Sequence, residues 1–223
     1  MTVGRAAAAE AIGTAFLVAL VVGSGIMGER LAQGNAAVAL LANSIATGAG
    51  LYALIIVFGP ISGAHLNPVV SAVSMWDGRL RLGHGFVYVL VQVSGAFVGV
   101  AAAHAMFELP IIQVSAHNRP TLGEGLGEVI ATFGLVLVIS LALKHRAEAI
   151  PLAVAAFITS AYWFTSSTSF ANPAVTFARA MTDTFAGISP SSVPLFIGAQ
   201  LIGGGAARLF ARWLLGGKSS NLA

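Results

Sequence analysis

The stretch FANPAVTFAR, residues 170–179, places an Asn-Pro pair inside an apolar run whose first charge is Arg179. A partial copy, AHLNPVVSAV, occupies residues 64–73. Asn is among the best N-cap residues of a helix, and Pro is favoured at the next position. We therefore predict that helices begin at Asn67-Pro68 and at Asn172-Pro173. The rest of the sequence has to explain what these two helix ends face.

The composition indicates an integral membrane protein. Of the 223 residues, 57% are hydrophobic and only 9% are charged, whereas about 25% of the residues of a soluble globular protein are charged. Small residues allow close helix packing in membranes, and the chain contains 26 Gly. It has no Cys, which excludes disulfides, thiolate metal sites and Cys nucleophiles. The net charge is +3. We interpret the basic residues as anchors in the loops and expect no nucleic-acid partner.

We expect an all-α architecture of six transmembrane helices and two shorter helices. A spanning helix needs about 20 apolar residues. The segments 67–77 and 172–182 are too short, because 11 residues at ~1.5 Å each cover about half of a ~30 Å hydrocarbon core; they are predicted to be re-entrant half-helices. The six predicted spans are residues 6–28, 36–58, 84–107, 125–144, 149–166 and 192–215.

The N-terminal 28 residues could pass for a signal peptide, because a charged start precedes an apolar segment. Glu10 interrupts that segment, however, and the apolar character continues past Gly23. We interpret it as a retained first span.

The Lys and Arg residues predict the orientation, since cytoplasmic loops carry an excess of them. With the N-terminus inside, three of the eleven lie outside: Arg30, Arg119 and Arg179. This bias predicts that both termini are cytoplasmic, which six spans permit. The eight on the inside are Arg5, Arg79, Arg81, Lys144, Arg146, Arg208, Arg212 and Lys218.

An internal repeat divides the single channel domain, residues 1–223, into a first half at 1–110 and a second at 120–223. AEAIGT from Ala9 resembles GEVIAT from Gly127, HLNPVV resembles FANPAV, and VQVSGA at 91–96 resembles AQLIGG at 199–204. Each half holds three spans, an odd number. The second copy must therefore be inverted relative to the first.

Inversion brings the two half-helices in from opposite faces, so that their N-termini meet near the midplane. Those ends carry partial positive charge and free N–H donors, which would repel cations and orient polar solutes. Irregular backbone at membrane depth is tolerated where it lines a cavity, so we expect pore-lining backbone at Gly63, Ala64, His65, Thr168 and Phe170. A single Asn-Pro pair is equally consistent with a loop turn; two in equivalent places favour a pore.

The two halves also place matching polar residues inside the membrane. Glu10 aligns with Glu128, and Gln92 aligns with Gln200. An intramembrane carboxylate marks either a proton or ion path or a buried network. We favour the network for both, with the carboxylates holding loop N–H groups and the glutamines bonding between helices. His65 adjoins Asn67 and is placed along the path.

No nucleophile–base set or metal cluster is visible, so we expect no enzyme activity, no cofactor and no metal site. The four remaining histidines lack metal-ligand spacing and are interpreted as structural or loop residues: His84, His104, His117 and His145.

Together these motifs resemble the aquaporin, or major intrinsic protein, family over nearly the whole chain. The resemblance rests on AEAIGT, SGAHLNPV, the Gln-x-x-Gly-Ala pattern of the third span, GEVIAT, FANPA and AQLIGG. It implies one pore per protomer, a homotetramer, and passive conduction of water or small neutral solutes without cofactor or ion coupling.

The chain departs from the family pattern at two motif positions. The first motif is Asn-Pro-Val, with Val69 in the third place, and the second motif Asn-Pro-Ala174 is followed by Val175 where the family normally has Arg. By the family's spacing the other filter positions are Thr47, Ser160 and Ser169. All four filter residues are small and uncharged, so the resemblance implies a wide filter that no fixed cation guards.

Pore diameter, lining donors and acceptors, and electrostatic barriers decide selectivity. A wide filter with three hydroxyls suits glycerol, urea and arsenous acid. The motif pair resembles the bacterial arsenic-resistance branch, so arsenite or methylated arsenicals are the sharpest substrate expectation, with the bacterial inner membrane as location. A secondary transporter with inverted repeats, a water-only channel and a membrane adhesion protein with a closed pore are the alternatives.

Arg179 lies four residues after Val175, on the same helix face. It either reaches the outer vestibule, where it would attract partly ionised solutes, or is an ordinary loop residue, for which Asp183 at i+4 is a candidate partner. We favour the ordinary loop residue.

Overall fold

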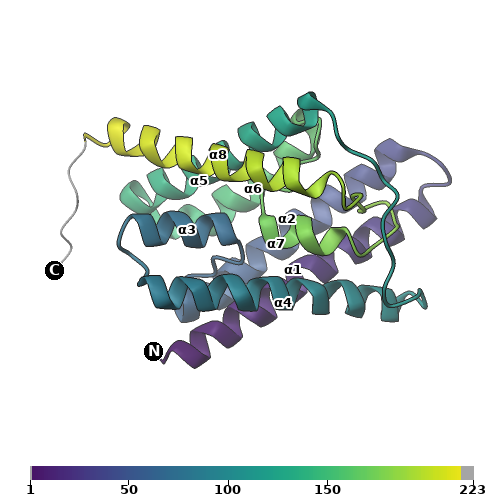
Figure 1. Cartoon of the computed structure of the whole chain (residues 1–223), viewed down its shortest axis with the longest axis horizontal. Helices are drawn as coiled ribbons and strands as arrows, with labels where there is room; N and C mark the ends of the chain where they lie inside the picture. The colour runs from purple at the N-terminus through teal and green to yellow at the C-terminus, as the bar shows by residue number, and fades with distance from the viewer. Residues whose placement is uncertain (1, 217–223) are drawn as a thin grey trace.

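The computed structural model describes residues 2–216. Residue 1, where the first predicted repeat begins, and residues 217–223, where the second ends, lie outside this range. So does Lys218, which was predicted to lie on the cytoplasmic side. All regular elements of the described chain are helices (Figure 1). They are α1 (Val3–Leu31), α2 (Ala36–Ser62), α3 (Pro68–Trp76), α4 (Leu82–Met106), α5 (Leu122–His145), the 3₁₀ turn η1 (Ala147–Ala149), α6 (Ile150–Phe164), α7 (Pro173–Arg179) and α8 (Val193–Leu214).

The fold class predicted from the sequence is confirmed. Six helices of the described chain, with η1 and α6 taken together, are long and apolar enough to cross a membrane. The two short helices begin at the predicted Asn-Pro pairs, and α3 ends close to the expected place. The helix α7 ends at Arg179, three residues earlier than predicted, because the next N–H groups, of Ala180 and Met181, bond three residues back instead of four.

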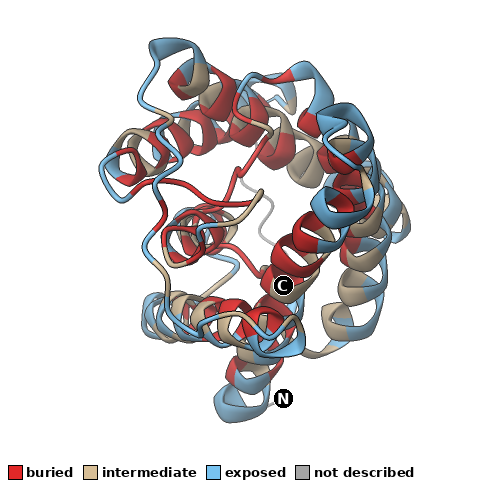
Figure 2. Ribbon diagram, turned by 90° about the vertical axis from the view of Figure 1, so that its right-hand side faces the viewer, coloured by how far each residue is buried: buried red, intermediate tan, exposed pale blue. Residues whose placement is uncertain are grey.

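The two halves of the chain pack in the same way. The helix α1 lies along α4 and α2, and α5 lies along α8 and α6, while α2 and α6 join the halves. The half-helices α3 and α7 contact each other, and each also contacts α4 and α8. Viewed from one end of the bundle, roughly along the helices, the helices surround a central region, and their buried faces turn toward it (Figure 2).

Glycine permits the closest helix contacts. A Cβ added at Gly95 of α4 would lie 2.2 Å from the carbonyl oxygen of Ala11 in α1, and one added at Gly203 of α8 would lie 2.4 Å from that of Val129 in α5. Neither position can hold a larger residue at the present helix separation. Small residues therefore set the distance between helices in both halves, as expected for a membrane bundle.

The helix α1 is an integral part of this bundle. It packs between α2 and α4, and the side chain of Glu10 is fully buried there. On the outer faces, large apolar side chains such as Phe16, Leu90 and Leu126 are more than half exposed. This inside-out distribution fits a lipid environment.

Candidate pore

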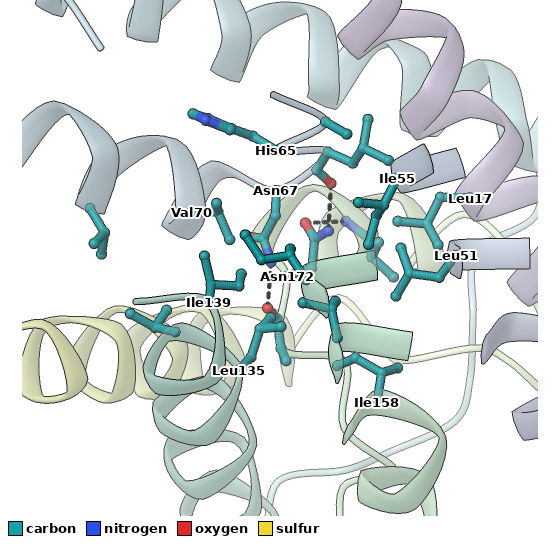
Figure 3. Close-up of a pocket in the computed structure, with 18 of the residues that line it drawn as sticks. Leu17, Leu51, Ile55, His65, Asn67, Val70, Leu135, Ile139, Ile158 and Asn172 are labelled. Carbon is teal, nitrogen blue, oxygen red and sulfur yellow. Dashed lines mark hydrogen bonds between the residues drawn. The ribbon is translucent and has the colours of Figure 1, made fainter. Parts of the chain in front are cut away.

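The two half-helices are joined to each other at their first residues. Asn67 Nδ2 donates to the carbonyl oxygen of Ala171 at 2.7 Å, and Asn172 Nδ2 donates to that of Leu66 at 2.7 Å (Figure 3). Each Asn Oδ1 meanwhile caps its own helix, accepting from the N–H of Val69 in α3 and of Ala174 in α7. One N–H of each amide remains available, because an amide nitrogen carries two.

The segments before the two Asn residues hold left-handed backbone. Ala64 and Leu66 have φ of 44° and 48°, and Ser169 and Ala171 have φ of 52° and 48°. Non-glycine residues in this region are strained by about 1–3 kcal/mol each and persist when their surroundings impose the conformation. Thr168, with φ of 61°, belongs to the second of these segments.

The two buried glutamates, Glu10 and Glu128, impose this left-handed conformation. Glu10 accepts from the N–H groups of His65 at 2.9 Å and Leu66 at 2.6 Å. Glu128 accepts from the N–H groups of Phe170 and Ala171, both at 2.8 Å. Each carboxylate thus satisfies the N–H donors of an irregular segment, which would otherwise lack partners at membrane depth. Neither carboxylate reaches the cavity described below.

The two glutamines tie these carboxylates to the half-helices. Gln92 Nε2 donates to Glu10 and to Ser71 Oγ, at 2.8 Å and 2.9 Å. Gln200 Nε2 donates to Glu128 and to Thr176 Oγ1. Ser71 and Thr176 each lie four residues after the motif Asn, so the arrangement is repeated in both halves.

A cavity of about 380 Å³ lies beside Asn67 and Asn172, which form part of its wall (Figure 3). Aliphatic side chains of α1, α2, α5 and α6 form most of its wall, and polar groups come from the half-helix starts. Of the residues predicted to line a path, those in its wall are Thr47, Gly63, Ala64, His65, Asn67, Ser169, Phe170, Asn172, Val175 and Arg179. Thr168, Pro68, Val69, Pro173, Ala174 and Ser160 lie outside it.

Val69, the first departure from the family motif, packs away from the cavity. Its side chain is buried with Val73 and Val136. A Cβ built at Gly204 of α8 would lie 2.3 Å from Val69 Cγ1, so the absence of a side chain at Gly204 makes room for the larger residue. Val69 therefore fills space between α3 and α8 without entering the path.

The expectation that Ser160 lines the filter is corrected. Ser160 is exposed on the outer side of α6, and its hydroxyl donates to the carbonyl of Ala156. The cavity face of α6 carries Val154, Ile158 and Tyr162, spaced four residues apart. Ser160 is off this stripe, because two residues turn a helix by about 200°.

Tyr162 lies in the cavity wall beside Thr47 and was not identified from the sequence. Its hydroxyl lies 3.3 Å from Thr47 Oγ1, where it can donate a hydrogen bond. The cavity wall beside Thr47 is therefore not lined by small residues alone. The spacing of four along α6 is the signal that identifies Tyr162.

The favoured interpretation of Arg179 is also wrong. Asp183 instead accepts from the N–H of Ala116 at 2.8 Å and lies 3.9 Å from His117. Arg179 is buried in the cavity wall, with its Cζ 3.4 Å from the ring centroid of Phe170, and its Nε donates to the carbonyl of Ala186. A guanidinium group thus stands one turn beyond Val175, and the wall is not free of fixed cations.

A second arginine approaches the same ring from the segment between α4 and α5. Arg119 donates through Nη1 to the carbonyl of Ser167 at 3.3 Å, and its Cζ lies 5.5 Å from the Phe170 ring centroid. Burial lowers the pKa of Arg119.

The opposite end of the cavity was not identified from the sequence. It is lined by Ser74 near the end of α3, by Arg79 and Leu80 in the turn after α3, and by Ser140 and Leu143 of α5. The end of α3 and the late part of α5 become neighbours only when the two halves of the chain assemble.

Comparison with known proteins agrees with this geometry. Aquaglyceroporin AqpS of Rhizobium meliloti is 50% identical over 211 residues, which are 95% of this chain and 90% of that protein. Aquaporin Z of Bradyrhizobium diazoefficiens is 29% identical over 93% of this chain and 92% of its own length. The crystal structure of an aquaglyceroporin from Plasmodium falciparum shares the fold, with a TM-score of 0.79 over the full length of both chains at 20% identity.

Residues 1–159 match the family model described as Major intrinsic protein. The members of this family are membrane channels rather than enzymes. The chain therefore belongs to the major intrinsic protein family, as the resemblance of its motifs predicts.

Proposed function

We propose that the protein is a passive channel for small neutral solutes, namely water, glycerol, urea, and arsenite or methylated arsenicals. It works in the bacterial inner membrane as a homotetramer with both termini cytoplasmic. Residues 1–110 form the first repeat, and residues 120–223 form the inverted second repeat. The AqpS relative is named an aquaglyceroporin, which supports solutes larger than water.

The observation that carries this proposal is the reciprocal pair of hydrogen bonds between Asn67 and Asn172 beside the cavity. It fixes both half-helix N-termini at one point of the path. The positive ends of the two helix dipoles then oppose cations from both directions. The remaining amide N–H of each Asn can donate to a passing hydroxyl, so a neutral polar molecule replaces part of its hydration there.

We assign the selectivity filter to Thr47, Tyr162, Ser169 and Val175. Ser169 Oγ is buried in the wall and has no hydrogen-bond partner among the described residues, so it is free to bond a solute. Val175 is short and uncharged, which leaves more room than an Arg at this position would. Hydroxyl groups beside an apolar wall suit glycerol, urea and arsenous acid, which expose several donors and acceptors.

Arg179 is assigned to the outer vestibule, where its charge attracts partly ionised solutes toward the filter. The wall contains no other charged group at this end among residues 2–216. Replacing Arg179 by Ala should reduce entry of an ionised methylated arsenical while glycerol flux persists. Equal arsenical flux in both proteins would exclude this role.

The test is stopped-flow light scattering of proteoliposomes with water, glycerol, urea and arsenous acid, for wild type and Val175→Arg. The wild type should pass all four, and the variant should keep water but lose the larger solutes. A wild type that passes water alone would show that another residue narrows the path, as a water-only channel requires.

The same vesicles distinguish a channel from a secondary transporter. A channel gives glycerol flux proportional to the gradient and indifferent to ionophores. Flux that saturates at low concentration or needs an ion gradient would favour a transporter, whose folds also use inverted repeats and broken helices.

A further inference from the structure

Each half of the chain carries a serine five residues before the motif Asn, namely Ser62 in the first half and Ser167 in the second. Ser62 Oγ accepts from the N–H of Ala64 at 3.1 Å, and Ser167 Oγ accepts from the N–H of Ser169 at 3.2 Å. The carbonyl oxygen of each serine also accepts a hydrogen bond from a side chain. The two side chains that donate it differ in kind and in origin.

In the first half the donor is a tyrosine of the spanning helix α4. The hydroxyl of Tyr88 donates to the carbonyl oxygen of Ser62 at 2.9 Å. The Tyr88 ring also meets the ring of His65 edge-on, with 5.4 Å between the centroids. Tyr88 lies four residues before Gln92, which holds Glu10. The first irregular segment is thus held entirely by helices of its own half.

The equivalent residue of the second half cannot make this bond. Phe196 lies four residues before Gln200 and so matches Tyr88 of the first half. Its ring meets the ring of Phe170 edge-on, with 5.0 Å between the centroids. The aromatic pair is therefore repeated, but phenylalanine has no hydroxyl to donate. The carbonyl of Ser167, a fully buried residue, needs another donor, because a buried carbonyl without a partner costs free energy.

Arg119 supplies that donor from the connection between α4 and α5. Its Nη1 donates to the carbonyl oxygen of Ser167 at 3.3 Å, and its Cζ lies 5.5 Å from the ring centroid of Phe170. Its backbone N–H donates to Ser192 Oγ at 3.0 Å, immediately before α8. The Arg119 side chain therefore reaches from the start of α8 to the segment that carries Ser169.

Main-chain hydrogen bonds fix the connection in which Arg119 lies. The N–H of Ser115 donates to the carbonyl of Ala180 at 3.0 Å. The N–H of Ser189 donates to the carbonyl of His117 at 2.7 Å. The connection thus runs along the chain between α7 and α8. Arg119 is held in place before its side chain makes any contact of its own.

The filter group that depends on this contact is the hydroxyl of Ser169. Ser169 lies in the cavity wall with a left-handed φ of 52°, a conformation that persists only when its surroundings impose it. Arg119 holds one end of the segment through Ser167, and Glu128 holds the other end at the N–H of Phe170. Arg119 itself does not line the cavity, so it can act on a solute only through the residues that it holds.

We propose that Arg119 is a positioning residue of the selectivity filter. Its hydrogen bond to the Ser167 carbonyl replaces the bond that Tyr88 makes in the first half, and it keeps the Ser169 hydroxyl in the path. The inference rests on the proposed channel function, in which that hydroxyl bonds a passing solute. A residue from outside the two repeats thus sets selectivity without touching the solute.

The first test compares Arg119→Ala with Arg30→Ala in proteoliposomes, by stopped-flow permeability to glycerol and water. Arg30 is the matched control, because its Nη2 donates to the carbonyl of Phe107 at 3.1 Å and its Cζ lies 5.1 Å from that ring, outside the cavity wall. Arg119→Ala should lower the ratio of glycerol to water permeability about fivefold, the effect of one hydrogen bond, and Arg30→Ala should change it less than about twofold. Both solutes are neutral, and a loss of folded protein lowers both permeabilities equally, so the ratio reports the filter.

Two further substitutions test the route of the effect. Phe196→Tyr in the Arg119→Ala protein supplies a hydroxyl at the place equivalent to Tyr88, and should restore the ratio to within about twofold of wild type. In a Ser169→Ala protein, Arg119→Ala should lower the ratio no further, because the hydroxyl that Arg119 places is gone. An unchanged ratio in Arg119→Ala, no recovery with Phe196→Tyr, or the full additional loss on top of Ser169→Ala would each overturn the proposal.

Thiol labelling separates this inference from the proposed solutes. In a Ser169→Cys protein, the rate of modification by a small methanethiosulfonate should change about threefold or more when Arg119→Ala is added, and less than about twofold when Arg30→Ala is added. A wild type that passes no glycerol would refute the proposed function but would leave this readout intact. Equal labelling rates in the two double variants would then overturn the positioning role itself.

Discussion

Replacing Glu10 by Gln tests how the irregular segment before α3 is held. The Glu10 carboxylate accepts four hydrogen bonds, from Ser62 O–H and the N–H of His65 on one oxygen, and from the N–H of Leu66 and the amide of Gln92 on the other. A glutamine has one acceptor oxygen. Whichever way its amide turns, two buried donors lose their acceptor and meet an NH₂ group instead.

The magnitude follows from this count. An unsatisfied buried donor costs about 1–3 kcal/mol, so Glu10→Gln should lower the free energy of unfolding by about 2–6 kcal/mol. The loss is comparable to the strain of about 1–3 kcal/mol held at each of the left-handed residues Ala64 and Leu66. The segment should therefore relax, which moves its carbonyls and Asn67 away from the path.

Two measurements check this expectation. The midpoint temperature of thermal unfolding in detergent should fall by about 5 °C or more. Glycerol flux in liposomes should fall to the fraction of protein molecules in which the path stays open. Glu29→Gln is the matched control, because Glu29 lies on the same helix and is exposed. A Glu10→Gln protein with the unfolding temperature and flux of wild type would show that the carboxylate does not hold this segment.

Two other predictions concern packing and the filter. Gly95→Ala should lower stability by about 1–3 kcal/mol, because its Cβ would lie 2.2 Å from the Ala11 carbonyl oxygen, whereas Gly83→Ala on the same helix, with nothing within 4 Å, should unfold at the wild-type temperature or above. Ser160→Val should leave the ratio of glycerol to water permeability unchanged, while Thr47→Val, which removes a hydroxyl from the wall, should lower it; the reverse ranking in stopped-flow assays would restore Ser160 to the filter.

The start of each half-helix and its support could be predicted from the sequence because the signals are local or repeated. An Asn-Pro pair specifies both the cap and the first residue of a helix, and Glu10 and Glu128 stand out as carboxylates in apolar spans. What no local pattern contains is the exchange of hydrogen bonds between Asn67 and Ala171, residues 104 apart in the sequence. That contact exists only after both halves have folded.

The filter residue on α6 was harder to predict because it was located by counting residues back from Asn172, and the backbone changes conformation within that interval. Counting back from Asn172 to Ser160 crosses residues 165–172, which are not helical, so the count does not preserve a helix face. The pairing of Arg179 with Asp183 failed for a similar reason. The i to i+4 relation holds within a helix, but α7 ends at Arg179 and Asp183 lies in the following turn.

Single cysteines can show whether solutes pass the cavity beside Asn67 and Asn172, because the chain has no cysteine of its own. Val175→Cys would place a thiol in the cavity wall, and Ser160→Cys would place one on the outer face of the neighbouring helix α6. Both are treated with a bulky polar methanethiosulfonate, and modification is verified by mass. Glycerol flux should fall to the level of empty liposomes for Val175→Cys and persist for Ser160→Cys. Full modification of Val175→Cys without loss of flux would contradict a path through this cavity.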